Sequence, residues 1–379
     1  MNRTTTIATA FLLSASGLSA ADWPMYRGDP SLTGVAQGRL PDKPELLWTF
    51  KAHAPVRSTA AIVGDRVFVG CNDSNVYALD FSTGKKIWAA TTDGTVESSP
   101  LVLNGTVFVG SSDGHLYALN ASDGKVLWKF KTDEKILAAP NWYARPASDT
   151  TSQDAAPVTN ILVGSYDYKL YSLNAVTGKS NWVYETGNYI NGSPAVGDGK
   201  TVFGGCDGLL HVVALSNGAL TGSNDIGAPI AASVGLAGDR AYFGHYQNRF
   251  VCADLTTGTN AWSYQSRNFP YFSSPAITPD RVVFGGRDKQ LHCVNRADGS
   301  PVWTFATRGR VDSSPVVAGE KVVVGSNDGR VYIVSMNDGS ELWSYDIGQP
   351  VESSPAVSRE KIVIGGDDGS VYCFGIKRQ

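Results

Sequence analysis

The sequence is poor in charge, in cysteine and in long apolar runs. Only 18% of its 379 residues are charged, while 10% are aromatic, and a disordered chain would show the opposite balance. Its 41 glycines are too many for a helical bundle and do not recur at every third position as in collagen. These absences leave a folded, turn-rich protein.

The basic residues do not gather into any run. The formal net charge is -3, and no cluster of Lys or Arg could follow a phosphate backbone, so nucleic acid is not an expected partner. Beyond the N-terminus, no stretch reaches the roughly 18 apolar residues of a membrane-spanning helix. We therefore expect no transmembrane segment.

Cysteine is scarce and scattered. The five residues are Cys71, Cys206, Cys252, Cys293 and Cys373. Their number is odd, and they include neither a CxxC pair nor an adjacent pair, so no zinc or redox motif is expected. At least one thiol must be unpaired within the chain.

Residues 1–21 are typical of a secretory signal peptide. They carry Arg3, an apolar stretch at 7–13 and small residues up to Ala21, in the order that export signals require. No cysteine stands at the cleavage site, so we expect a periplasmic or secreted protein without a lipid anchor. Residues 22–44 are expected to form an extended segment ahead of the remaining chain.

A repeat of about 40 residues organises the rest of the chain. Seven tryptophans mark it, with spacings of 40, 40, 54, 80, 41 and 40 residues: Trp48, Trp88, Trp128, Trp182, Trp262, Trp303 and Trp343. The gap of 80 places a missing tryptophan at Gly222, and the gap of 54 indicates an insertion at about 143–158. A glycine that closes an apolar run recurs eight times in the same register.

Each unit reads as four short strands. In the second unit they are 98–102, 106–110, 115–120 and 125–131. These runs are rich in Val, Tyr, Phe and Trp, which favours strand over helix, and Asp113-Gly114 predicts a two-residue hairpin between the second and third strands. The period indicates an all-β protein, an eight-bladed β-propeller of four-stranded antiparallel blades over residues 45–376.

Proline and the two chain ends indicate how the ring is arranged. A proline such as Pro100 recurs inside the first strand, and because proline cannot donate to a sheet ladder, this strand is expected at the sheet edge along the central channel. The tryptophan strand is then outermost. The C-terminal unit lacks a tryptophan strand and residues 45–56 supply one, so both chain ends are expected to share one blade and close the ring.

The position just before each first strand varies around the ring. In blade order it is Arg57, Glu97, Leu137, Asn191, Ala231, Phe272, Asp312 and Glu352. One side of this channel mouth is charged, and the other, to which Tyr271 is added, is mostly apolar. Converging polar and aromatic groups are typical of binding sites, so we predict a ligand or peptide site here, although solvated loop variation would give the same pattern. Departures from the repeat in blades three to five, such as Gln247-Asn248, make that flank the alternative partner surface.

An aspartate recurs at the turn between the second and third strands. The residues are Asp73, Asp113, Asp167, Asp207, Asp288, Asp328 and Asp368. Carboxylates are calcium ligands, but turns of adjacent blades lie too far apart to share an ion, and aspartate in a tight turn bonds its own backbone. We predict a structural role for these residues and no metal site.

Residues 78–88, 118–128 and 172–182 resemble the A-x-D-x-x-T-G-K-x-x-W docking motif of quinoprotein propellers. With the Ser-Ser-Pro strands, they make the chain similar to the pyrroloquinoline-quinone-like (PQQ-like) repeat propellers over about residues 45–376. That family includes quinoprotein dehydrogenases and the cofactor-free outer-membrane assembly factor BamB. The resemblance implies either a binding scaffold or a quinone enzyme.

Because no catalytic constellation is evident, we predict a non-enzymatic, monomeric, BamB-like scaffold of the cell envelope. Its expected partner is a protein, a peptide or a small ligand, and no cofactor is expected. The alternative is a small PQQ-dependent oxidoreductase, with the quinone and calcium at the channel mouth and an acidic residue such as Asp312 or Glu352 as base.

Overall fold

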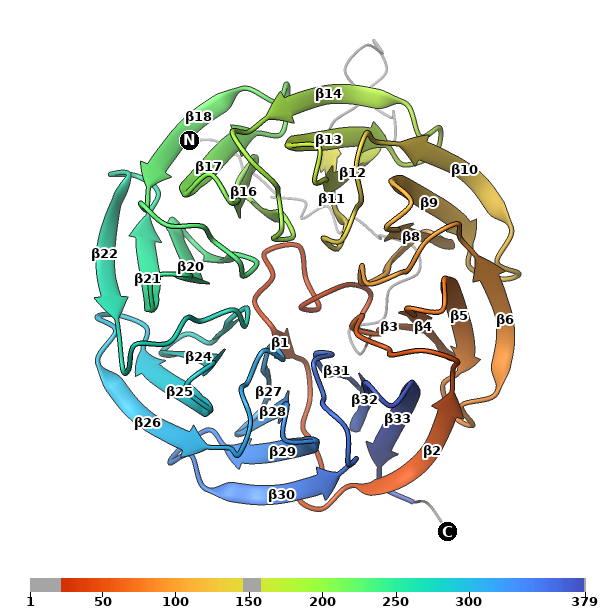
Figure 1. Cartoon of the computed structure of the whole chain (residues 1–379), viewed down its shortest axis with the longest axis vertical. Coiled ribbons are helices and arrows are strands. Elements are labelled where there is room, and N and C mark those ends of the chain that lie inside the picture. Colours follow the sequence, from red (N-terminus) through yellow and green to blue (C-terminus); the bar gives the residue numbers. More distant parts are fainter. Residues whose placement is uncertain (1–21, 146–157, 378–379) are drawn as a thin grey trace, which may run out of the picture.

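The computed structural model describes residues 22–145 and 158–377 (Figure 1). The predicted signal peptide and most of the predicted insertion lie outside these ranges. Within them the chain forms 33 strands in eight sheets. None of the described residues belongs to a helix with the length and apolarity that a membrane crossing requires.

The eight sheets are the blades of a propeller, which confirms the fold that the repeat predicts (Figure 1). Blade 1 contains β3 (Ala61–Val63), β4 (Arg66–Gly70), β5 (Asn75–Asp80) and β6 (Lys86–Thr91); blade 2 contains β7 (Leu101–Leu103), β8 (Thr106–Gly110), β9 (His115–Asn120) and β10 (Val126–Lys131). Blade 3 contains β11 (Asn141–Arg145), β12 (Val158–Gly164), β13 (Lys169–Asn174) and β14 (Ser180–Glu185); blade 4 contains β15 (Ala195–Gly197), β16 (Lys200–Gly204), β17 (Leu209–Ala214) and β18 (Leu220–Asp225).

The second half of the ring repeats this plan. Blade 5 contains β19 (Gly235–Ala237), β20 (Arg240–His245), β21 (Arg249–Asp254) and β22 (Thr259–Tyr264); blade 6 contains β23 (Ala276–Ile277), β24 (Arg281–Gly286), β25 (Gln290–Asn295) and β26 (Pro301–Ala306). Blade 7 contains β27 (Val316–Ala318), β28 (Lys321–Gly325), β29 (Arg330–Ser335) and β30 (Glu341–Asp346); blade 8 contains β31 (Ala356–Ser358), β32 (Lys361–Gly365), β33 (Ser370–Gly375) and β2 (Glu45–Lys51).

Blade 8 joins the two ends of the chain. Strand β2 pairs antiparallel with β33, so that Trp48 lies opposite Cys373 (Figure 1). The sheet order β2-β33-β32-β31 puts the tryptophan strand outermost. The predicted closure of the ring is thus confirmed.

The core lies between neighbouring blades. In β4, Val67 and Val69 pack toward blade 8, whereas Phe68 packs toward blade 2, because successive side chains of a strand point to opposite faces. The tryptophans add a second contact at the rim. The indole N–H of Trp48 donates to the Phe81 carbonyl at 3.0 Å, and a Cβ on Gly84 would stand 2.5 Å from that ring. Each blade is therefore buried on both faces.

The Ser-Ser-Pro segments do not belong to the first strands, so that detail of the prediction is wrong. Pro100 precedes β7 by one residue, and the segment is held from neighbouring blades instead. The Ser99 hydroxyl accepts the N–H of Thr59 in blade 1 at 2.9 Å, and the Ser98 hydroxyl donates to Ala138 O of blade 3 at 2.9 Å. Serine side chains thus link the blades around the channel.

The predicted two-residue hairpin at Asp113-Gly114 is also wrong, since a four-residue loop joins β8 to β9. Gly114 has a φ of +82°. The Asp113 carboxylate accepts the backbone N–H of His115 at 2.8 Å, the N–H of Asp93 at 3.0 Å and the Tyr117 hydroxyl at 2.6 Å. Aspartate therefore ties the hairpin to the preceding loop, and it needs the longer loop to do so.

These bonds predict a dependence of stability on pH. Burial raises the pKa of Asp113, but the hydrogen bonds from Tyr117 and the two N–H groups outweigh it, so the pKa lies below the ordinary 3.8. A carboxyl with a lowered native pKa stabilises the fold above pH 4 and loses that contribution as the pH falls. Asp113→Asn is expected to lower the free energy of unfolding by about 1 kcal/mol at pH 7, after allowance for solvent screening.

The check is denaturant unfolding of Asp113→Asn and of the parent protein at pH 7 and pH 3. The difference between them should shrink at pH 3, because the unfolded carboxyl takes up a proton there while the folded carboxyl, with its lowered pKa, resists protonation. Asp239→Asn, at an exposed turn, is the control and should match the parent at both pH values. A difference for Asp113→Asn that grows with acid would contradict the assignment.

The segment before the repeats crosses the centre of the ring (Figure 1). Its residues 23–36, called the plug below, bond to the innermost strands of most blades. Ile62 exchanges two backbone bonds with Trp23, and N–H groups of the next inner strands donate to the plug at 2.7–3.0 Å: Val102 to Pro24, Val196 to Pro30, Leu236 to Ser31, Ile277 to Thr33 and Val317 to Gly34. Strand β1 (Val35–Ala36) pairs parallel with β27. The inner strands of these blades, which were expected to be sheet edges along the central channel, therefore form backbone hydrogen bonds with the plug.

Arg27 anchors the plug in the middle of the ring. Its side chain is 1% exposed, and its guanidinium donates to the carbonyls of Ser314 at 3.1 Å, Pro275 at 2.7 Å and Pro315 at 2.5 Å. Burial lowers the pKa of Arg27 to about 10, so the group stays charged at neutral pH. One arginine thus links the plug to blades 6 and 7.

Candidate functional site

The eight predicted mouth positions line one cavity of about 220 Å³, together with serines of the Ser-Ser-Pro segments and Tyr26. Tyr26 belongs to the plug, and its hydroxyl lies 3.0 Å from Ser274 Oγ and 3.1 Å from Ser314 Oγ. The cavity is therefore blind, because the plug closes the channel behind Tyr26.

Tyr271 does not share this cavity. It is buried with Tyr264 and Phe284 in the core of the ring, and its hydroxyl accepts the N–H of Ser266 at 3.1 Å. Adjacent residues of an extended chain point to opposite sides, so only one of the two aromatic residues can face the mouth. Phe272 is that residue.

A second ring of side chains surrounds the mouth, and the sequence reading missed it. Its members precede the turn aspartate of each blade, or Gln247 in blade 5: Asn72, Ser112, Tyr166, Cys206, Tyr246, Arg287, Asn327 and Asp367. Several of them contact the inner position of the next blade, as Asn327 does when its amide donates to Glu352 at 2.9 Å. Because these residues differ from blade to blade, the sequence could have identified them as site residues.

Glu352 is the centre of one charged group. Its carboxylate lies 2.9 Å from Arg310 and 3.4 Å from Arg57, and Arg57 also pairs with Asp367 at 3.0 Å. Burial raises the pKa of Glu352, but the bonds from Asn327 and Arg310 and the charge of Arg57 outweigh it and hold the pKa below its ordinary value. The carboxylate is thus ionised at neutral pH.

Asp312 is the centre of the second charged group. It pairs with Arg287 at 3.0 Å and with Arg310 at 3.0 Å. Glu97 differs from both acids, because among the described residues it accepts a hydrogen bond from the Asn72 amide at 3.4 Å rather than pairing with an arginine of its own. The predicted charged side is therefore mostly a lattice of arginine–carboxylate pairs.

The opposite side of the mouth is aromatic and weakly polar. The Phe272 ring lies between Tyr246, with ring centroids 4.5 Å apart, and the Arg287 guanidinium, 4.0 Å from the ring. The Asn191 amide donates to Cys206 Sγ at 2.9 Å. Burial raises the pKa of Cys206, so this thiol is protonated rather than nucleophilic at neutral pH.

Among the described residues that line the cavity, no serine hydroxyl forms a hydrogen bond with a basic or acidic side chain. Its lining residues include no histidine or lysine, so no serine there faces a base of the usual kind. The serines instead bond to one another, to Tyr26 and to the backbone, as Ser314 does when it accepts the N–H of Ser274 at 2.9 Å. The arrangement can hold a polar group and an apolar group side by side, which is a binding geometry.

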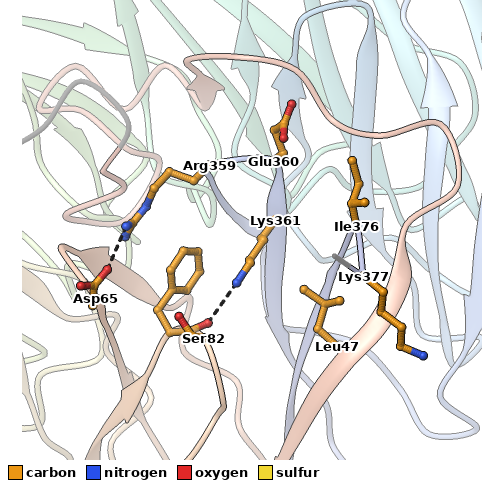
Figure 2. A pocket seen from close by; sticks show the side chains of 9 residues that line it. Leu47, Asp65, Ser82, Arg359, Glu360, Lys361, Ile376 and Lys377 are labelled. Atoms are coloured by element: carbon orange, nitrogen blue, oxygen red, sulfur yellow. Dashed lines mark hydrogen bonds and ion pairs between the residues drawn. The ribbon is translucent and has the colours of Figure 1, made fainter. Parts of the chain in front are cut away.

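A larger cavity of about 470 Å³ lies where blades 8 and 1 meet (Figure 2). Its Arg359 guanidinium lies 4.6 Å from the Phe81 ring and pairs with Asp65 at 3.1 Å, and Lys361 donates to the Phe81 carbonyl at 3.4 Å. Both cations therefore already have partners across the junction. The contacts around this cavity help to join blades 8 and 1, and we do not take the cavity as the candidate site.

The described residues define an eight-bladed propeller whose plugged channel leaves one polar mouth. The chain belongs to the PQQ-like repeat family whose model is described as outer membrane protein assembly factor BamB, which matches residues 41–158, 158–271 and 270–378. No curated protein sequence matches the chain at a significant level.

Solved structures with the same fold come from different functional classes. The computationally designed Ika8 protein is 17% identical, with a TM-score of 0.75, over 88% of this chain and 100% of its own. BamB from Moraxella catarrhalis is 18% identical, with a TM-score of 0.68, over 87% and 98%. A europium-containing methanol dehydrogenase is 14% identical, with a TM-score of 0.75, over 94% and 98%. At such identities the likeness establishes the fold alone.

Proposed function

We propose that this chain is a non-catalytic binding propeller of the cell envelope, which holds a segment of a partner protein in its channel mouth. The observation that carries the proposal is the convergence of all eight variable inner positions on one blind cavity. Membership of a family described by an outer-membrane assembly factor supports an envelope location and a protein partner. The signal peptide expected at residues 1–21 is consistent with export.

The residues of the mouth do not suit pyrroloquinoline quinone, a flat tricarboxylate that needs open stacking faces and, with calcium, free oxygen ligands. The Phe272 ring already packs against Tyr246 and Arg287. Asp312 and Glu352 are already paired with arginines at 2.9–3.4 Å, and a calcium ion would have to displace those partners. We therefore propose that the chain binds no quinone.

A photo-crosslinking residue in place of Ala231 tests the mouth. In envelope preparations it should capture a partner protein, and Phe272→Ala combined with Glu352→Gln should lower the yield about tenfold, because central aromatic and paired charged residues carry most binding energy. Val176→Ala combined with Glu341→Gln, which changes exposed residues away from the mouth, is the control. Equal capture by the mouth variant and the control would exclude the mouth as the site.

Titration with PQQ and calcium separates binding from oxidoreduction. We expect no saturable change in the quinone absorbance and no dye-linked oxidation of alcohols. Tight quinone binding with turnover would overturn the non-catalytic proposal.

A further inference from the structure

A set of exposed cations surrounds the mouth on blades 5 to 7. These residues, called the basic arc below, are Arg249, Arg267, Lys289 and Arg308, and all four are exposed. Arg249 begins β21 directly after the loop of Tyr246, and the other three lie in the same loops as the mouth residues Phe272, Arg287 and Arg310. Ion pairs join Arg287 and Arg310 to Asp312, and in the part of the chain that the structure describes no carboxylate forms an ion pair with the basic arc.

The nearby acids bond to groups other than the side chains of the arc. Asp328 accepts the backbone N–H of Arg308 at 2.8 Å and the Tyr332 hydroxyl at 2.9 Å. Asp288 is buried and lies 3.1 Å from His292 Nε2, and Asp312 is shared by two other arginines. The protein as a whole is negative, with a formal charge of -3. A positive sector on a negative protein attracts an acidic partner and selects its orientation.

Exposed aromatic rings accompany the arc. Tyr246 is 47% exposed and Phe269 is 48% exposed, and both lie in its loops. Arginine and aromatic residues are enriched in protein interfaces, where rings supply contact area and cations supply specificity. The combination therefore favours a protein surface over a free small anion.

We propose that the basic arc binds an acidic, extended segment of the partner protein that enters the mouth. This inference rests on the proposed function above. Glu97, which precedes β7 of blade 2 across the ring from blade 6, would repel the same segment, so its acidic part lies over blades 5 to 7. A membrane surface suits the arc less well, because the half-exposed Phe269 offers little insertion energy and the cations lie in or beside loops that line a cavity.

The probe is a fluorescein-labelled peptide of alternating Glu and Tyr residues, compared with a twin in which Gln replaces Glu. Fluorescence anisotropy with the mature protein should show binding of the Glu peptide about tenfold tighter than of the Gln peptide at low salt, with loss as salt screens the charges. Removing the arc by Arg249→Gln, Arg267→Gln, Lys289→Gln and Arg308→Gln together should weaken the Glu peptide about tenfold.

The matched control removes four exposed lysines at or next to turns on the other face, by Lys85→Gln, Lys86→Gln, Lys125→Gln and Lys179→Gln. It lowers net charge equally and should leave binding within about twofold of the parent. Equal binding of the two peptides, or an equal loss in the arc variant and the control, would overturn the proposal.

Vesicles of phosphatidylglycerol test whether the arc binds an anionic membrane surface instead of an acidic peptide. Arc-dependent binding to vesicles without arc-dependent binding of the Glu peptide would assign the arc to a membrane and overturn the proposal. Crosslinking from position 231 keeps the two proposals apart. Capture that depends on Phe272 and Glu352 but not on the arc refutes the arc alone, whereas capture that depends on neither refutes the proposed function.

Discussion

Replacing Arg27 by alanine is expected to lower the free energy of unfolding by about 3 kcal/mol. The guanidinium makes three hydrogen bonds to carbonyls of blades 6 and 7, and bonds to a charged donor contribute roughly 1.5–3 kcal/mol each. The carbonyls of a fully buried site would lose their donor without gaining water. Alanine also removes the cost of burying a charge, which offsets part of the lost hydrogen bonding. The expected loss is therefore smaller than the sum of the three hydrogen bonds.

The measurement is guanidinium chloride unfolding at pH 7. Arg39→Ala, an exposed arginine of the same N-terminal region, is the control and should change stability by less than about 0.5 kcal/mol. Arg27→Lys should fall between the two, because an ammonium cannot reach three carbonyls with the geometry of a planar guanidinium. If Arg27→Ala unfolded at the same midpoint as Arg39→Ala, the plug would not contribute to the stability of the ring.

Restoring the missing tryptophan by Gly222→Trp is expected to raise the free energy of unfolding by about 2 kcal/mol. In most blades an outer-strand indole donates to a carbonyl of the next blade, as Trp303 does to Met336 at 3.0 Å. By the same spacing along the sequence, a tryptophan at position 222 would donate to the carbonyl of Leu255. A Cβ at 222 meets nothing nearer than Val212 at 3.8 Å, so a side chain can begin there without a clash. Burying a large side chain contributes about 1.5–3 kcal/mol.

The control for this gain is Ser223→Trp, which puts the same side chain on an exposed position of β18. Thermal unfolding of both variants should separate burial from a general effect of added tryptophan. A Gly222→Trp protein no more stable than Ser223→Trp would mean that blade 5 does not offer the docking surface that the other blades do.

The fold could be predicted because the repeat writes the same physical constraints eight times. Trp48 and Gly84 illustrate this, since the indole can lie flat on the next blade only where the facing turn lacks a side chain. The outer position of the tryptophan strand and the shared blade followed from the spacing of the tryptophans and the order of the chain ends. Local errors arose where one residue serves two blades, as Ser98 and Asp113 do.

The candidate site could be predicted only in part. The inner ring was visible because it breaks a strict repeat, and all eight predicted inner positions line the cavity. Tyr271 was misplaced because sequence alone does not show which of two adjacent rings faces the channel. The plug was not predicted, since residues 22–44 carry no repeat and contribute through single contacts such as that of Arg27. Pairing of Asp312 with Arg287 depends on loops of different blades and has no signal in one sequence.

The plug also has a consequence for the order of folding. Its residues precede every blade in the chain, yet Arg27 bonds to Pro315, 288 residues away. Contacts between such distant segments form late, because loop closure must be completed before they contribute. The contacts of Arg27 therefore form only after blade 7 has formed, and the pairing of β2 with β33 forms only after the last strand is present. A chain truncated before blade 7 lacks some of the plug's partners, and a chain truncated before β33 lacks the partner of β2.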